Sequence, residues 1–243
     1  MKAFYSIVIA VITLTACAKK PIVKQPVTTM NKQDTSKAVA NDSLSYLALG
    51  DSYTIGEAVV RKDSYPYQLT GLLNASALKV ATPTIIATTG WTTDNLINAI
   101  ANSNITNKKF DFVTLLIGVN DQFQHLSQEN YTVKFTEVLN TAINFAKGDT
   151  SRVFVLSIPD YGVTPFAGGN DAVIGPQIDQ FNAINKEISA KAGVNYLDIT
   201  GISRQAATNP ALIAPDGLHP SGAMYTDWMV VLAPMVASRL KGH

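Results

Sequence analysis

The chain has 243 residues, a mass of 26.1 kDa and 47% hydrophobic residues, enough to give one large domain or two small ones a proper core. This composition excludes disorder for most of the chain. The 19 Lys and Arg residues balance 18 Asp and Glu residues, so the net charge of +1 gives no general field for attracting nucleic acid. One cysteine and three histidines exclude an internal disulfide framework and leave too few soft ligands for a zinc finger or ribbon.

Residues 1–16 are predicted to be a signal peptide. Lys2 precedes an apolar run over residues 3–16, which is too short to span a membrane and ends in small residues, as a secretory signal does. The run continues into Cys17 as LTAC, which resembles a bacterial lipobox. That resemblance implies that Cys17, the only cysteine, becomes the lipid-modified N-terminus of a protein exported to the bacterial cell envelope. The alternative is an ordinary signal cut near Ala16, with an incidental thiol.

Residues 17–42 are expected to hold the lipidated cysteine and a flexible tether. The segment from Ala18 to Asp42 is polar, lacks helical or strand periodicity and contains five Lys against two Asp. A flexible chain of this length has an r.m.s. reach of about 25–30 Å, enough to hold a folded domain away from a lipid surface. Residues 43–243 are then left as the folded domain, with a net charge of −3.

Short apolar runs in this domain are predicted to be buried strands. The clearest is Phe110–Ile117, and another, Ile85–Ala87, follows Pro83. The predicted strands are residues 44–49, 85–87, 110–117, 152–158 and 194–199.

Apolar residues at helical spacing separate the strands. Residues 135–146 and 178–192 show this spacing and are followed by Gly148 and Gly193, which are placed to stop each helix. Ser64, two residues before a proline, is expected to begin an earlier helix. Ser221 is expected to open the last helix, which is predicted to turn these side chains inward: Met224, Trp228, Val231, Leu232 and Met235.

Strands that alternate with helices indicate an α/β fold, here a three-layer α/β/α sandwich with a central parallel sheet. We find no internal repeat or second linker, so residues 43–243 are predicted to form a single domain. Ligands of such sheets bind beyond the carboxyl ends of the strands, and the turns at those ends are therefore where a functional site is expected.

Four turns carry the residues that suggest a chemistry. They read GDSY at residues 50–53, TGW at 89–91, GVND at 118–121 and DGLHP at 216–220. Together they resemble the SGNH, or GDSL-type, hydrolase family, and the resemblance covers essentially the whole predicted domain. It implies a flavodoxin-like three-layer fold and the hydrolysis of an ester or thioester through an acyl-enzyme.

Such chemistry needs a base, because a serine hydroxyl is a poor nucleophile at neutral pH. His243 is the last residue and His125 lies in a polar loop, whereas His219 follows Asp216 by three residues in a turn bounded by Gly and Pro. This spacing lets the carboxylate hold one ring nitrogen while the other faces Ser52. We expect Ser52 to be the nucleophile, His219 the base and Asp216 the orienting carboxylate. The alternative for the last two is a capped turn that leads into the final helix.

The resemblance also implies an oxyanion hole, made by the backbone N–H groups of Ser52 and Gly90 and the side-chain amide of Asn120. Gly90 has no Cβ, so a substrate oxygen can approach its amide, and Asn120 offers an uncharged NH2 group. Alternatively, Gly90 is a simple turn glycine. Asp51 and Asp121 are interpreted as structural residues that bond local backbone amides and fix the two turns.

The segment Pro159–Pro176, rich in Gly and Pro, is predicted to be a long loop that walls the substrate site, or else an ordered surface loop without catalytic consequence. Tyr53, Trp91 and Phe166 are candidates for an apolar acyl pocket, although aromatic side chains at strand ends often serve packing alone.

The leading hypothesis is a lipid-anchored serine esterase of the cell envelope, which releases an acyl or acetyl group from a glycan, lipid or small ester and needs neither metal nor cofactor. A lysophospholipase or thioesterase acting on membrane-derived lipids is an alternative. The rival from another class is a non-catalytic lipoprotein that binds glycan or lipid in the same cleft, although a binding module has no need of a proton relay. We expect a monomer that meets the membrane through its lipid anchor and does not bind nucleic acid.

Overall fold

The computed structural model describes residues 43–241. The predicted signal peptide, the predicted lipidation site at Cys17 and the predicted tether lie outside the described residues, as does His243. No helix within residues 43–241 is both long and apolar enough to cross a membrane.

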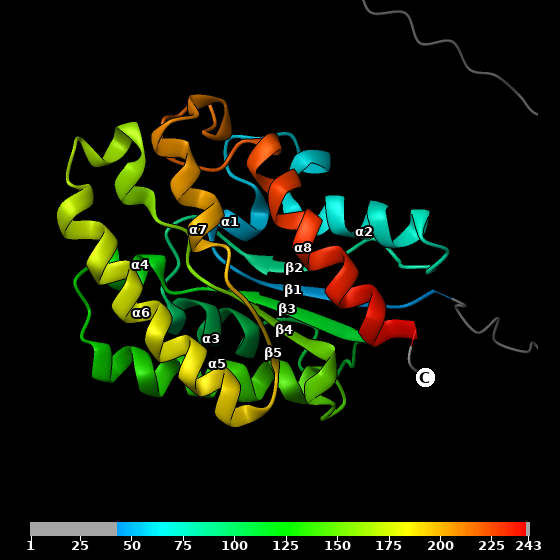
Figure 1. The fold of residues 1–243 in the computed structure, drawn as a ribbon. Helices are drawn as coiled ribbons and strands as arrows, with labels where there is room; N and C mark the ends of the chain where they lie inside the picture. Colours follow the sequence, from blue (N-terminus) through cyan, green and yellow to red (C-terminus); the bar gives the residue numbers. More distant parts are fainter. Residues whose placement is uncertain (1–42, 242–243) are drawn as a thin grey trace, which may run out of the picture. The chain divides into compact units, whose positions relative to one another are not determined.

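The described residues form a five-stranded, entirely parallel sheet between two layers of helices (Figure 1). In spatial order the strands are β2 (Thr84–Ala87), β1 (Tyr46–Gly50), β3 (Phe112–Leu116), β4 (Val153–Leu156) and β5 (Asn195–Leu197). Every residue of β1, β3 and β4 is buried, as expected for strands covered on both faces. The predicted fold class is confirmed, and each strand end lies within two residues of its prediction.

Helices cover both faces of the sheet (Figure 1). On one face α2 (Tyr65–Ala75) packs against α8 (Gly222–Lys241), and on the other α5 (Gln128–Phe145) packs against α3 (Thr93–Ala101) and α6 (Asp171–Ala192). Three shorter helices follow the ends of strands: α1 (Ser52–Ile55), α4 (Val119–Phe123) and α7 (Thr200–Ser203). Single 3-10 turns occur at residues 61–63, 150–152, 161–163, 165–167, 204–207 and 210–212.

The predicted helix ends follow from local chemistry. Ser64 is the N-cap residue of α2, with Pro66 in its first turn. α6 ends at Gly193, which has a φ of 72°. α5 ends before Gly148, whose N–H donates to the Ile143 carbonyl at 2.9 Å.

The prediction for the buried face of α8 was wrong at Val231, which is 41% exposed. The buried side chains repeat at helical spacing along one stripe, and Val231 falls beside that stripe. The stripe consists of Met224, Tyr225, Trp228, Met229, Leu232, Val236 and Leu240.

The predicted loop from Pro159 to Pro176 is shorter than expected, because α6 begins at Asp171 and includes Pro176. Gly175 lies inside α6, where its lack of a side chain lets Asp160 pack closely against the helix. A Cβ on Gly175 would lie 3.1 Å from Oδ2 of the buried Asp160 carboxylate. The irregular segment is therefore residues 159–170, with 3-10 turns at 161–163 and 165–167.

Candidate active site

Ser52 begins α1, directly after β1 ends. The chain turns here at Gly50, where a Cβ would lie 2.3 Å from the Leu116 carbonyl oxygen, so only glycine fits. Asp51 caps α1, and its Oδ1 atom accepts a hydrogen bond from the Tyr53 amide at 3.0 Å. Ser52 is thereby held, largely buried, beyond the carboxyl end of the strand.

Asp216 and His219 form a bonded pair in the turn that precedes α8. Asp216 Oδ1 accepts hydrogen bonds from the backbone N–H groups of Leu218 and His219, both at 3.0 Å, and Oδ2 lies 2.6 Å from His219 Nδ1. Burial alone raises the pKa of Asp216, but the hydrogen bonds from the His219 ring and the two amides outweigh it and hold this pKa below its usual range. The ionised carboxylate therefore engages Nδ1, which leaves Nε2 as the nitrogen that can accept a proton.

Ser52 and His219 line the same cavity, which has a volume of about 130 Å³. The His219 ring lies edge-on to the Tyr53 ring, with their centroids 5.7 Å apart. Tyr225 of α8 donates a hydrogen bond to the Tyr53 carbonyl at 3.0 Å and so ties α8 to α1. Within residues 43–241 no hydrogen bond joins the Ser52 hydroxyl to His219. Hydrogen bonds of this kind often tighten only in the substrate complex.

The residues expected to form the oxyanion hole line this cavity as well. Gly90 has a φ of 81°, and a Cβ there would meet no atom within 4 Å, so the backbone conformation is what favours glycine. In the described part of the chain, the backbone N–H groups of Ser52 and Gly90 donate to no other protein group. Asn120, in α4, donates from Nδ2 to the Trp91 carbonyl at 3.0 Å, which leaves its second amide hydrogen for another acceptor.

Asp51 and Asp121 are buried beneath these turns. Asp51 bonds a local amide, as expected, whereas Asp121 Oδ2 accepts from the backbone N–H and hydroxyl of Thr93, at 2.9 and 3.1 Å, and so joins α4 to the start of α3. The expectation of a local partner was wrong for Asp121. Burial raises the pKa of Asp51 to about 8 and that of Asp121 to about 6.

An aromatic cluster forms one wall of the cavity. Phe123, Tyr161 and Phe166 lie with ring centroids 6.0 to 6.5 Å apart, and Phe123 and Phe166 are 48% and 53% exposed. Of the predicted pocket residues, Tyr53 and Phe166 line the cavity and Trp91 does not. Sequence reasoning missed Phe123 and Tyr161. The signal for Phe123 was its position three residues after Asn120, one helical turn along the same short helix.

The segment that carries Tyr161 and Phe166 is pinned at both ends. The Phe166 amide donates to the Gly217 carbonyl at 3.0 Å, in the turn that holds Asp216 and His219. At the other end, the buried Asp160 carboxylate accepts a hydrogen bond from Arg204 Nε at 2.8 Å. The predicted wall of the substrate site is thus fastened to the turn that carries His219.

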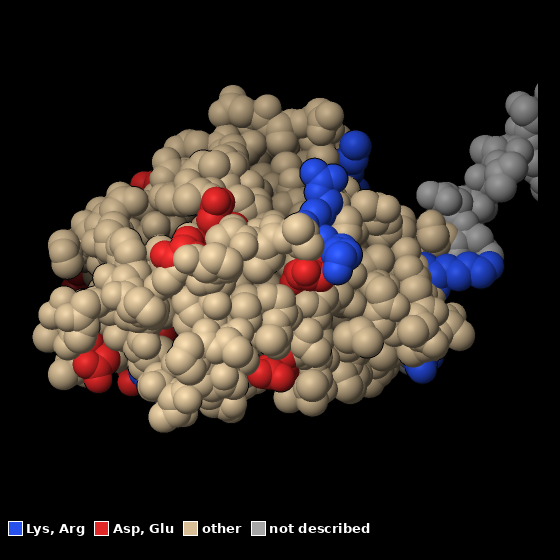
Figure 2. Space-filling view, turned by 90° about the horizontal axis from the view of Figure 1, so that it is seen from above, with Lys and Arg blue, Asp and Glu red and all other residues tan. Residues whose placement is uncertain are grey.

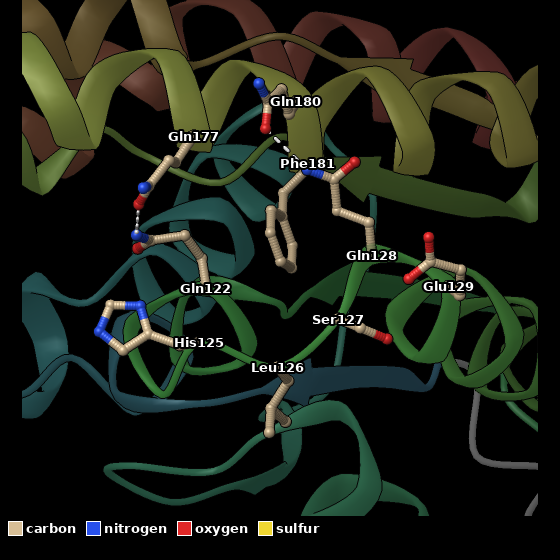
Figure 3. A pocket seen from close by; sticks show the side chains of 9 residues that line it. All are labelled: Gln122, His125, Leu126, Ser127, Gln128, Glu129, Gln177, Gln180 and Phe181. Carbon is tan, nitrogen blue, oxygen red and sulfur yellow. Dashed lines mark hydrogen bonds between the residues drawn. The ribbon is translucent and has the colours of Figure 1, made fainter.

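His125 lies away from the Ser52 cavity. It lines a second cavity beside the start of α5 (Figure 3). Of the described histidines, His219 is therefore the one that lines the same cavity as Ser52. No group of three His, Cys, Asp or Glu side chains that could hold a metal ion occurs within residues 43–241.

Three comparisons with known proteins bear on this arrangement. Residues 48–226 match the GDSL-like lipase/acylhydrolase family. No curated protein matches the sequence. Among solved structures, an acetylxylan esterase from Geobacillus stearothermophilus is similar, with a TM-score of 0.61 and 19% identity over 82% of this chain and 95% of that chain.

Two further solved structures share the fold. An α/β hydrolase from the metagenome of Lake Arreo, Spain, has a TM-score of 0.59 and 19% identity over 81% of this chain and 94% of that one. A putative lipolytic protein of the G-D-S-L family from Desulfitobacterium hafniense has a TM-score of 0.58 and 14% identity, over 81% and 99%. At these identities the structural matches establish the fold, whereas the family match spans most of the described domain. The chain therefore belongs to the GDSL-like lipase/acylhydrolase family, as its four turn motifs led us to expect, and it is an ester hydrolase.

Proposed function

We propose that this protein removes short acyl groups, acetyl above all, from a glycan through an acyl-enzyme on Ser52. The observation that carries the proposal is the 2.6 Å pair of Asp216 and His219 on the wall of the cavity that Ser52 lines. A base that is oriented in this way can activate a serine hydroxyl, which a site for binding alone does not require.

The reaction proceeds in two halves. His219 Nε2 takes the Ser52 proton as Oγ attacks the ester carbonyl, and the oxyanion that forms accepts hydrogen bonds from Ser52, Gly90 and Asn120. Collapse breaks the bond to the alcohol, which leaves with the proton from His219. Water then loses a proton to His219 and attacks the acyl-enzyme, and the carboxylic acid departs as Ser52 regains its proton.

The size of the cavity supports a short acyl group. Its volume of about 130 Å³ is small beside the roughly 300–1,000 Å³ of pockets that take drug-sized ligands. Apolar walls from Val119, Phe123 and Leu218 suit a methyl group or a short alkyl chain. This favours acetyl release over the lysophospholipase or thioesterase alternative, since a long acyl chain needs a longer apolar channel.

A neutral leaving group is supported by the distribution of charge. Within the described residues no Lys, Arg, Asp or Glu side chain lines the Ser52 cavity, and the view from above shows few charged side chains, of both signs, on a mostly uncharged face (Figure 2). A similar structure is described as an acetylxylan esterase. We further propose that the protein is exported and anchored in the cell envelope through Cys17 of the LTAC motif, where surface glycans are within reach.

The activity is tested with p-nitrophenyl esters of two to twelve acyl carbons. We expect kcat/KM to peak at two to four carbons and Ser52→Ala to abolish turnover while the circular dichroism spectrum is unchanged. No turnover of any ester would favour the non-catalytic binding lipoprotein. A maximum of kcat/KM at eight or more acyl carbons would favour the lysophospholipase or thioesterase alternative.

The anchor is tested separately by metabolic labelling with a fatty-acid analogue. We expect labelled protein in the membrane fraction and loss of the label in Cys17→Ser. A label that survives this substitution would refute the proposed anchor without affecting the proposed activity.

A further inference from the structure

A second, larger cavity lies on the other side of α4 from the Ser52 site. It has a volume of about 470 Å³ and opens between the turn at residues 125–127, the first turn of α5 and one face of α6 (Figure 3). Four glutamines line it, Gln122 and Gln128 from one side and Gln177 and Gln180 from α6. We call it the glutamine groove.

The four glutamines form two pairs across the groove. Gln122 Nε2 donates to Gln177 Oε1 and Gln128 Nε2 donates to Gln180 Oε1, each at 2.7 Å (Figure 3). Each bond fixes the orientation of both amides and uses only part of their hydrogen-bonding capacity. The Nε2 groups of Gln177 and Gln180 keep donors for a ligand, and Gln128 Oε1 keeps its acceptor sites. The four glutamines thus present an oriented set of uncharged donors and acceptors.

An aromatic ring lies between the two pairs. Phe181 projects from α6 into the space between them (Figure 3), and its ring packs against the Tyr131 ring with centroids 4.8 Å apart. Because Phe181 is only 4% exposed, its ring is held within the core, and the ligand-facing groups of the groove are the amides, which match the hydroxyl groups of a pyranose ring.

The charges that line the groove exclude other ligand classes. No lysine or arginine lines it, whereas the Glu129 carboxylate does, so a phosphate, sulfate or polyanion finds no cation there and meets a repelling charge. Most of its wall is polar, which does not suit an acyl chain. The ligand is not expected to bind to the backbone N–H groups at the start of α5. The Asn130 N–H, in the first turn of this helix, already donates a hydrogen bond to the Ser127 hydroxyl oxygen at 3.1 Å. A neutral, polyhydroxylated ligand fits best.

The groove and the catalytic cavity share α4 as a common wall. Asn120 and Phe123 line the catalytic cavity, and Gln122, between them in the sequence, lines the groove. Gln122 also lies beside Tyr161, which lines the catalytic cavity. A chain of sugar units that presents an ester to Ser52 therefore has a polar groove next to it, across one short helix.

We infer that the glutamine groove is a glycan subsite, which binds sugar units of the ester substrate while their acyl group occupies the catalytic cavity. This inference rests on the proposed function, since it assigns the leaving group to a neutral oligosaccharide. It makes Gln177 and Gln180 specificity-determining residues that contact the sugar and take no part in the chemistry at Ser52.

The test compares two substrates of the full-length protein, p-nitrophenyl acetate and partially acetylated xylo-oligosaccharides of four to six units. The double variant Gln177→Ala/Gln180→Ala is expected to raise KM for the oligosaccharides about tenfold, because two hydrogen bonds are lost. Its kcat/KM for p-nitrophenyl acetate is expected to equal that of the wild type. Gln205→Ala, an exposed glutamine that lines neither cavity, is the matched control and is expected to change neither value.

A binding measurement separates this inference from the proposed activity. Unacetylated xylo-, cello-, manno- and chito-oligosaccharides are titrated calorimetrically into Ser52→Ala, with and without the two groove substitutions. We expect binding of at least one oligosaccharide, weakened about tenfold by the groove substitutions. Equal binding with and without them, or no binding of any of the four, would overturn the glycan subsite. If the wild-type protein does not turn over p-nitrophenyl acetate, the proposed function is refuted instead.

Discussion

The Asn120 side-chain amide donates one of its two hydrogens to the Trp91 carbonyl, with 3.0 Å between the nitrogen and the oxygen. This bond joins α4 to the turn that carries Gly90, so two of the proposed oxyanion donors are positioned by each other. It also orients the Asn120 amide, because the carbonyl can only accept and therefore faces Nδ2 and not Oδ1. The second hydrogen of Nδ2 is left to meet a developing negative charge.

Asn120→Ala is therefore expected to lower kcat on p-nitrophenyl acetate by about 10²–10³-fold, which is the usual cost of one oxyanion donor, with a smaller change in KM. Asn120→Asp is the sharper variant, since it keeps the shape of the side chain and replaces the donor by a carboxylate that repels the oxyanion. We expect it to be at least as impaired as the alanine variant. Activity near that of the wild type in Asn120→Asp would remove Asn120 from the oxyanion hole.

Asp216→Asn tests the orienting carboxylate. The amide oxygen of the variant can still accept from the Leu218 and His219 backbone, which keeps the turn, but an uncharged group no longer stabilises the imidazolium. We expect kcat to fall by about 10²–10⁴-fold with little change in KM or in the melting temperature. Steady-state kinetics measure kcat and KM, and thermal unfolding measures the melting temperature. A large loss of stability with unchanged kcat would support the alternative in which Asp216 merely caps the turn.

Asp51 gives the stability of the fold a predictable dependence on pH. Burial raises its pKa to about 8, and the neighbouring Asp121 adds to the rise, whereas an aspartate in an unfolded chain has a pKa near 3.9. Between about pH 4 and pH 8 the folded protein thus holds a proton that the unfolded chain has lost. The free energy of unfolding contributed by this group is present below about pH 4 and is lost as the pH rises towards 8.

Asp51→Asn removes this titration and keeps an oxygen for the Tyr53 amide. We expect the variant to gain stability relative to the wild type as the pH rises from 5 to 8, measured by urea unfolding at several pH values. Asp63→Asn, at a surface carboxylate paired with exposed Lys62, is the control and is expected to run parallel to the wild type. Parallel curves for Asp51→Asn would contradict a buried, protonated Asp51.

Sequence patterns predicted the sheet and the pairing of Asp216 with His219 well because both depend on local signals. Buried parallel strands are apolar runs, and Gly193 ends α6 through its own backbone conformation. The pairing of Asp216 with His219 is also local, since three residues of one turn set it. Such features need no knowledge of which distant segments come together.

Features that depend on tertiary contacts were missed. Gly175 and Pro176 have the composition of a turn, yet α6 runs through them because Gly175 packs against Asp160 from another segment. Asp121 bonds Thr93, 28 residues earlier in the chain. Likewise, Tyr161 belongs to the cavity wall only because its segment folds back towards α4. Local propensity does not encode these contacts.

The segment that carries Tyr161 and Phe166 is held in place by the ion pair of Arg204 and Asp160. Arg204 donates from Nε to Asp160, whose carboxyl is buried, and from a terminal nitrogen to Asp179 at 2.8 Å. Arg204→Ala leaves the Asp160 carboxylate without its cation. Loss of one partner lowers the free energy of unfolding by about 3–5 kcal/mol in a fully buried ion pair. We expect a loss of about 2 kcal/mol here, because the Arg204 side chain is 38% exposed. The segment that holds Tyr161 and Phe166 is then less well fixed, so we also expect KM for short esters to rise several-fold, with a smaller change in kcat. Asp179→Ala removes only the exposed partner of the same arginine and is expected to cost less than about 1 kcal/mol. Urea unfolding and steady-state kinetics of the two variants decide the matter: equal effects would mean that the Asp160 contact does not hold the cavity wall.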